Sequence, residues 1–81
     1  MISHKIAVTG IVQGIGFRPF IYNLAQRLQL TGNVCNSAHG LEIVIQGAPE
    51  QVARFEKTVR ETPPLHSRID YFQCDETIPN P

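Results

Sequence analysis

The sequence has no excess of charge of either sign, because seven Lys and Arg residues balance seven Asp and Glu residues. A neutral chain has no bulk electrostatic attraction to nucleic acid or to an anionic membrane surface. Any anion site must therefore be built locally from a few residues. The chain also lacks an apolar run long enough for a signal peptide or a membrane span, so we expect a cytoplasmic location.

Cysteine is scarce. The sequence holds two, Cys35 and Cys74, and without an export signal we expect two reduced thiols and no disulfide. No C-x-x-C pair or Cys/His cluster has the spacing of a zinc site, and His4, His39 and His66 are scattered along the chain. The sequence therefore predicts no metal site and no cofactor in this domain.

Repeats, linkers and low-complexity segments are absent too. The content of 42% hydrophobic and 17% charged residues is ordinary for a globular protein. At 81 residues the chain is near the lower size at which one core can hold a fold. We therefore expect residues 1–81 to form one domain.

Hydrophobic periodicity predicts four strands and two helices. The strands are predicted at 5–12, 33–36, 41–47 and 67–75, and the helices at 19–30 and 49–61. Pro19 and Pro49 occupy the first position of the two predicted helices, where a missing N–H costs nothing. Gly32 is interpreted as the stop signal of the first helix. The tail at 76–81 is expected to be frayed.

The pattern within the strands adds detail. Residues 5–12 are apolar on both faces, which is typical of a central strand, while Ile69 and Phe72 break the alternation of the last strand and indicate a β-bulge. The order β-α-β-β-α-β, with right-handed crossovers, predicts the fold class. It is α+β, a ferredoxin-like sandwich with an antiparallel sheet and two helices on one face.

A Gly-rich turn, QGIGFR, joins the first strand to the first helix. Gly14 and Gly16 allow backbone conformations in which successive N–H groups converge beside the positive end of the helix. Arg18 adds a forked cation that suits bidentate contact with a phosphate. The candidate phosphate-binding loop consists of Gln13, Gly14, Ile15, Gly16, Phe17 and Arg18. From the residues alone, a turn that only bends the chain and a solvated arginine remain alternatives.

Two nucleotide-binding motifs are excluded at this turn. It lacks GxxxxGK[ST], and it lacks the third glycine of a dinucleotide fingerprint.

Four segments of the chain resemble the acylphosphatase family: VQGIGFRPF, TGNVCN, GLEIVIQG and PPLHSRID. The resemblance spans nearly the whole chain, and GFRPF and PPLHSRID are most similar to the N-terminal domain of the carbamoyltransferases of hydrogenase maturation. It implies an acylphosphatase-type hydrolase, and it implies that residues 1–81 are the N-terminal fragment of a larger multidomain enzyme. The short final strand that the family usually adds has no counterpart after Thr77.

The resemblance also implies roles for two side chains. It assigns Arg18 to phosphate binding and Asn36 to holding the attacking water, although the residues alone would make Asn36 a typical hairpin-turn residue. An acyl phosphate carries a good leaving group, so positioning and charge stabilisation can suffice for its hydrolysis. The implied ligands are carbamoyl phosphate and inorganic phosphate. The implied partners are the later domains of the enzyme and the maturation protein that accepts the carbamoyl group, with no nucleic acid and no membrane.

Other functions stay open. A stand-alone generic acylphosphatase is less favoured, because many of these carry a large aromatic residue where this chain has Asn33. A catalytically idle anion-binding or docking module would need the same turn. An RNA recognition domain shares the β-α-β-β-α-β order, but the neutral charge and the lack of exposed aromatic residues on the first and third strands disfavour it. We expect Cys35 to be a small packing residue and His39 a solvated hairpin residue.

Overall fold

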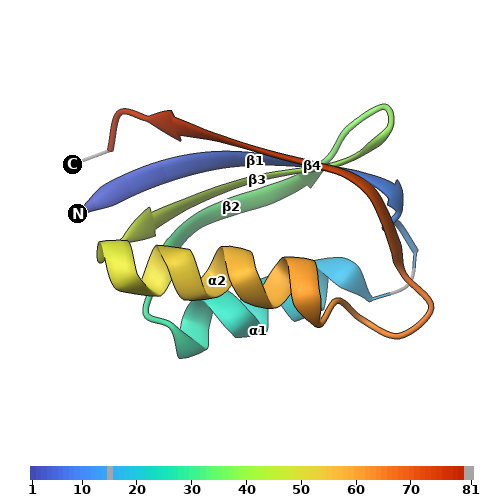
Figure 1. The fold of residues 1–81 in the computed structure, drawn as a ribbon, viewed down its shortest axis with the longest axis horizontal. Helices are drawn as coiled ribbons and strands as arrows, with labels where there is room; N and C mark the ends of the chain where they lie inside the picture. The colour runs from blue at the N-terminus through green and yellow to red at the C-terminus, as the bar shows by residue number, and fades with distance from the viewer. Residues whose placement is uncertain (15, 80–81) are drawn as a thin grey trace.

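The computed structural model describes residues 1–14 and 16–79, and within them four strands and two helices follow in the predicted order. They are β1 (Ile2–Ile11), α1 (Phe17–Arg27), β2 (Thr31–Asn36), β3 (Gly40–Gly47), α2 (Pro49–Glu61) and β4 (Arg68–Thr77). The strands pair antiparallel in the spatial order β2-β3-β1-β4. Both helices cover the same face of the sheet (Figure 1). The predicted ferredoxin-like fold is confirmed.

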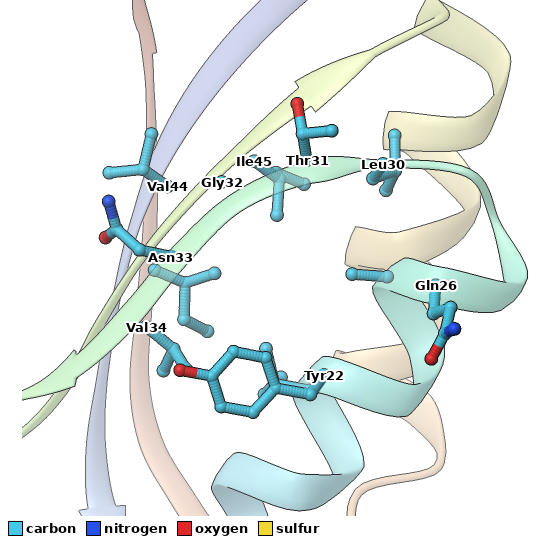
Figure 2. Close-up of a pocket in the computed structure, with 12 residues that line it drawn as sticks. Tyr22, Gln26, Leu30, Thr31, Gly32, Asn33, Val34, Val44 and Ile45 are labelled. Atoms are coloured by element: carbon cyan, nitrogen blue, oxygen red, sulfur yellow. The ribbon is translucent and has the colours of Figure 1, made fainter.

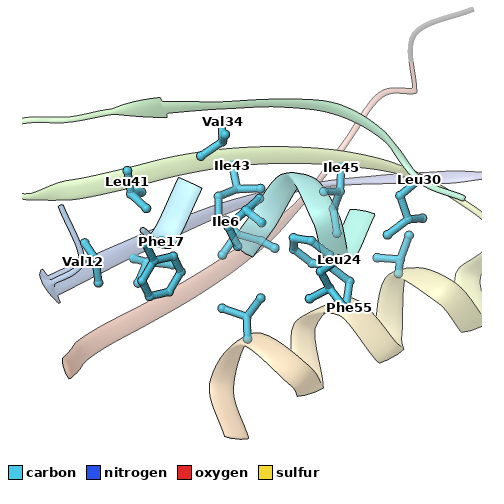
Figure 3. Packing of buried hydrophobic residues seen from close by; sticks show 14 residues of the cluster. Ile6, Val12, Phe17, Leu24, Leu30, Val34, Leu41, Ile43, Ile45 and Phe55 are labelled. Carbon is cyan, nitrogen blue, oxygen red and sulfur yellow. The ribbon is translucent and has the colours of Figure 1, made fainter. Parts of the chain in front are cut away.

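The hydrophobic core lies between this face of the sheet and the two helices. Alternate residues of β1 and β3 point into it, and Phe17, Leu24 and Phe55 fill the space from the helices (Figure 3). Strand β1 is an interior strand of the sheet, as predicted. The helices cover only one of its faces, so Ile6 and Val8 are buried while Ile11, on the other face, is exposed. The buried side chains include Ile6, Val8, Val12, Phe17, Ile21, Leu24, Leu41, Ile43, Ile45, Val52, Phe55 and Val59.

Helix α1 begins two residues earlier than predicted. Gly16 is its N-cap, in the left-handed region with φ 81°, and Phe17 is its first residue. Pro19 is therefore the third helical residue and not the first. The shift is tolerated because no N–H of the first helical turn has an intrahelical acceptor, so a proline there removes no hydrogen bond.

Helix α1 also ends earlier, and Gly32 is not its stop signal. Gln29 adopts a positive φ of 59°, its N–H donates to the Gln26 carbonyl at 3.1 Å, and the Leu30 N–H donates to the Ala25 carbonyl at 2.8 Å. This pair of hydrogen bonds is a Schellman motif at the C-terminus of the helix. Gly32 instead lies in β2 with φ 145°, where an added Cβ would sit 1.8 Å from the Val44 carbonyl oxygen. Close strand pairing therefore requires this glycine.

The first and the last strand of the chain are both longer than predicted near the termini. Strand β1 starts at Ile2, before the predicted residue 5, because Ser3 pairs with both β3 and β4. Glu76 and Thr77, predicted to be frayed, belong to β4, and the Thr77 hydroxyl donates to the Ser3 hydroxyl at 2.9 Å. Residues 80 and 81 of the predicted tail lie outside the described residues.

The predicted bulge in the last strand is present. Thr9 of β1 pairs with Tyr71 and Gly10 pairs with Ile69, so Asp70 is an extra residue in β4. The shift allows both Ile69 and Phe72 to pack against the core despite their odd spacing. The bulge therefore resolves the broken alternation.

Cys35 and Cys74 are free thiols on the two opposite edge strands, β2 and β4. Cys35 is exposed, so the expectation of a packing residue is wrong. The reason is the alternation of β2, which buries Val34 against the helices and turns Cys35 to the uncovered face of the sheet. His39 is exposed in the hairpin, as expected. In the described part of the chain, neither helix is long and apolar enough to cross a membrane.

Candidate functional site

The Gly-rich turn and Asn36 line one small cavity of about 220 Å³. The loop that follows β1, the first turn of α1 and the end of β2 supply its walls. Each predicted site residue that the structure describes is among the lining residues, and Ile15 lies outside the described residues. The lining residues are Val12, Gln13, Gly14, Gly16, Phe17, Arg18, Pro19 and Asn36.

Two glycines shape the backbone of this cavity. Gly14 has φ 72° and Gly16 has φ 81°, a region that residues with a Cβ rarely adopt. A Cβ built on either residue would meet no atom within 4 Å, so conformation and not crowding is what calls for glycine. The open space in front of both residues leaves the backbone accessible to a ligand.

The first turn of α1 gives the cavity a positive electrostatic character. The N–H groups of Phe17 and Arg18 have no intrahelical acceptor, and no described side chain caps the helix. No acidic residue occupies the first turn. The positive end of the helix dipole is therefore uncompensated by an acidic side chain in this turn, an arrangement that favours an anion.

The side chains of Arg18 and Asn36 remain available for a ligand. Both residues are exposed, and across residues 1–14 and 16–79 neither side chain makes a hydrogen bond or an ion pair. Asn36 lies two residues beyond the buried Val34, hence on the same face of β2, the face that the helices cover. This register turns the Asn36 side chain toward the helix that carries Arg18.

Phe17, the residue before Arg18, anchors this part of the loop in the core. Its side chain is 1% exposed in the core, and its ring meets the Phe20 ring edge-on with 5.8 Å between centroids. A buried aromatic residue beside Arg18 fixes the backbone from which the guanidinium projects. The loop therefore presents its cation from a rigid base.

The Gln13 side chain ties the two halves of the cavity together. Its Nε2 donates to the Gly40 carbonyl at 2.7 Å and to the Ser37 carbonyl at 3.1 Å. The Ser37 N–H in turn donates to the Gly40 carbonyl, which closes the hairpin just after Asn36. Sequence reasoning included Gln13 only for its backbone, because acceptors 24 and 27 residues away leave no local signal.

A larger depression of about 380 Å³ lies elsewhere, between α1 and the edge strand β2. Tyr22 and Gln26 border it from the helix, and Asn33 and Val34 border it from the strand (Figure 2). No charged residue lines it. A dianion would find no cation there, whereas the smaller cavity combines Arg18 with the backbone of the Gly-rich turn.

Comparison with known proteins places the chain in a family. The sequence pattern of acylphosphatases matches residues 4–81. The chain belongs to the acylphosphatase family. Acylphosphatase of Lactobacillus johnsonii is 38% identical over 74 residues, which cover 90% of this chain and 80% of that protein. The family therefore also includes proteins that consist of little more than this one domain.

Larger proteins carry an acylphosphatase-like domain as well. Carbamoyltransferase HypF of Synechocystis sp. is 46% identical over 71 residues, which cover 88% of this chain and 9% of that protein. A crystal structure of full-length HypF in the phosphate- and nucleotide-bound form superposes with a TM-score of 0.91 at 41% identity, over 94% of this chain and 10% of that one. The chain thus spans about a tenth of the HypF carbamoyltransferases that it matches.

The tether made by Gln13 can be tested on stability. Gln13→Met keeps the length of the side chain but removes the amide that donates to the Ser37 and Gly40 carbonyls, of which Gly40 keeps the Ser37 N–H as a donor. The substitution should therefore lower the free energy of unfolding by about 1–2 kcal/mol in urea denaturation. Gln26→Met, at an exposed position on α1, is the matched control. Equal unfolding free energies for the two variants would show that the tether contributes nothing.

Proposed function

We propose that this domain binds and hydrolyses an acyl phosphate, and that its substrate is carbamoyl phosphate. The observation that carries the proposal is the single cavity shared by the Gly-rich turn, Arg18 and Asn36. It combines backbone N–H groups at the start of a helix, a permanent cation and an amide that has no partner among the described residues. Together these groups match a phosphoryl group and a water molecule.

In the proposed reaction, the turn and the start of α1 hold the phosphoryl oxygens while the Arg18 guanidinium contacts two of them. The Asn36 amide holds a water molecule in line with the bond to be broken. The water oxygen attacks phosphorus, the P–O bond to the acyl group breaks, and the acyl group leaves with the bridging oxygen and the bonding electrons. The water's protons pass to solvent and to the phosphate product. Carbamoyl phosphate would thus yield phosphate and carbamate, with no strong general acid required.

The carbamoyl group is proposed from the relatives. HypF proteins are named carbamoyltransferases, and one of their structures is described as phosphate-bound. If this chain is the N-terminal part of such an enzyme in hydrogenase maturation, its partners are the later domains of that enzyme and the protein that accepts the carbamoyl group. A stand-alone acylphosphatase acting on generic acyl phosphates is the second candidate, supported by the 38% identity to the Lactobacillus johnsonii protein.

Phosphate release by the purified domain distinguishes these functions. A domain adapted to carbamoyl phosphate should hydrolyse it with a higher kcat/KM than benzoyl phosphate. Comparable kcat/KM values for the two substrates would favour the generic acylphosphatase. No release from either substrate would favour an idle anion-binding or docking module and would overturn the proposed hydrolase.

Inorganic phosphate should stabilise the native protein by binding in the same cavity. At 100-fold excess over its dissociation constant, binding to the native state alone contributes about 2.7 kcal/mol. For a domain of this size we expect a rise in melting temperature of about 10–20 °C, measured by thermal denaturation.

Phosphate also stabilises proteins through general exclusion from their surface, so controls are needed. The site-specific part is the difference in melting-temperature shift between the wild type and Arg18→Ala at matched ionic strength, with sulfate as a second anion. Equal shifts in the two proteins would mean that the turn holds no specific phosphate.

A further inference from the structure

Three side chains capable of binding a metal meet on the helix-covered face of the sheet, where α2 lies against β1 and the edge strand β4. They are His4 of β1, Glu56 of α2 and Cys74 of β4. His4 Nδ1 lies 2.5 Å from Glu56 Oε2 and 3.2 Å from Cys74 Sγ, and the thiol donates to Glu56 Oε2 at 2.9 Å. The candidate phosphate site does not use any of the three residues.

The fold brings this His–Glu–Cys triad together by register. His4 lies two residues before the buried Ile6 on β1, and Cys74 pairs directly with Ile6, so both residues lie on the face that the helices cover. Glu56 follows the buried Phe55 and borders the apolar stripe of α2. Strand pairing and helix packing therefore hold one ligand atom each from three separate elements.

The triad matches the ligand preferences of zinc. Imidazole nitrogen, thiolate sulfur and carboxylate oxygen are its three common protein ligands. With metal–ligand bonds of about 2.0–2.3 Å, neighbouring ligand atoms in a tetrahedral site lie about 3.4–3.6 Å apart. The three atoms of the triad need to spread by less than about 1 Å to accept an ion at their centre.

Charge and accessibility also fit a divalent cation. A Cys74 thiolate and the Glu56 carboxylate together carry two negative charges, which balance one Zn²⁺. The side chains of His4 and Glu56 are 19% and 16% exposed, whereas Cys74 is exposed and leaves a route for the ion and a water ligand. Of the other charged side chains near Cys74, the Asp75 carboxylate attracts a cation and the Arg60 guanidinium repels it.

We propose that His4 Nδ1, Glu56 Oε2 and Cys74 Sγ bind one zinc ion, with water in the fourth position. Binding forms an Nδ1–Zn, an O–Zn and an S–Zn bond and breaks the S–H bond, whose proton passes to solvent. The His4 ring then carries its proton on Nε2. Without metal, partial desolvation of the thiol and its hydrogen bond to the Glu56 carboxylate raise the pKa of Cys74 to about 12, so the ion must displace this proton when it binds.

The three proposed ligands are far apart along the chain, so no local sequence motif indicates this site. The sequence predicts no metal site because it contains no local cluster of Cys and His residues. Here the ligands lie 52 and 70 residues from His4, and one of them is a carboxylate. Only strand pairing and the packing of α2 bring them together.

Cobalt(II) binding to the tag-free, reduced protein tests the site directly. We expect one equivalent of Co²⁺ to give the thiolate-to-cobalt charge-transfer band in the near ultraviolet and the visible bands of a tetrahedral centre, and Zn²⁺ to displace it. Cys74→Ser should lose the charge-transfer band, whereas Cys35→Ser, which removes the thiol on the opposite edge strand, should retain it. His4→Gln and Glu56→Gln should each weaken binding at least about tenfold.

Zinc should also raise the melting temperature of the wild type by about 10–20 °C at 100-fold excess over its dissociation constant, and not that of Cys74→Ser. Serine keeps a hydroxyl donor for Glu56, and metal-free melting curves check that each variant folds. If Cys74→Ser fails to fold, His4→Gln and Glu56→Gln decide the outcome. No cobalt band in the wild type, a band that survives Cys74→Ser, or a band that depends on Cys35 would each overturn the proposal and leave the triad as a hydrogen-bonded contact between β1, β4 and α2.

Discussion

Arg18→Ala is expected to abolish measurable phosphate release from acyl phosphates. The guanidinium is the cation assigned to the phosphoryl oxygens, and an arginine in a comparable position contributes about 10³–10⁵ to kcat in phosphoryl transfer. The fold should survive, because Arg18 is exposed and its side chain has no partner among the described residues. The measurement is steady-state hydrolysis of carbamoyl and benzoyl phosphate, with circular dichroism to confirm that the variant is folded.

Two further variants sharpen the test of Arg18. Arg27→Ala removes an exposed arginine from the last turn of the same helix, so its activity should stay near that of the wild type. Arg18→Lys should restore little activity, because a point charge cannot reproduce the planar fork that contacts two oxygens. Near-normal kcat in Arg18→Ala would exclude this residue from the site.

Asn36→Ala is expected to lower kcat far more than it weakens phosphate binding. The amide is assigned to the attacking water and not to the dianion, so its loss should appear in the chemical step. Losing one positioned polar group costs about 3 kcal/mol in comparable sites, which corresponds to a drop of about 100- to 200-fold in kcat. Kinetics with carbamoyl phosphate give kcat, and competition by inorganic phosphate gives its affinity.

Asn33→Ala is the matched control for this prediction. Asn33 is exposed on the same strand, but it borders the larger apolar depression and not the candidate site. Its substitution should leave kcat and phosphate affinity unchanged. If Asn36→Ala instead loses phosphate affinity and keeps kcat, Asn36 belongs to the phosphate cradle and its assigned role is wrong.

Much of the architecture could be predicted because it depends on neighbouring residues. The alternation of Leu41, Ile43 and Ile45 indicates a strand with one buried face, and the stripe of Val52, Phe55 and Val59 indicates a helix; both predictions are confirmed. The positive φ angles of Gly14 and Gly16 could be predicted as well, because the conformational freedom of a glycine is a property of that residue alone. Nearly all of the candidate phosphate-binding loop is contiguous, so a single turn was enough to suggest it.

The ends of elements were predicted less well, because tertiary packing competes with local signals there. The sequence predicts Gly32 as the stop signal of α1, yet Gln29 takes the left-handed conformation that ends the helix. Ending the helix at this point allows Leu30 to be buried in the core, at 7% exposure. The burial of a large apolar side chain outweighs the modest cost of a positive φ in a residue other than glycine.

The elements, the fold class and the turn that offers backbone N–H groups and Arg18 follow from the sequence alone. The tertiary structure decided which distant side chains join them: β2 brings Asn36 to the cavity, the Gln13 amide bonds to the hairpin, and His4 meets Glu56 and Cys74. The physical reason is one of range. A backbone conformation responds to its neighbours in the chain, whereas a contact between residues tens of positions apart exists only once strand register and helix packing have fixed where each side chain lies.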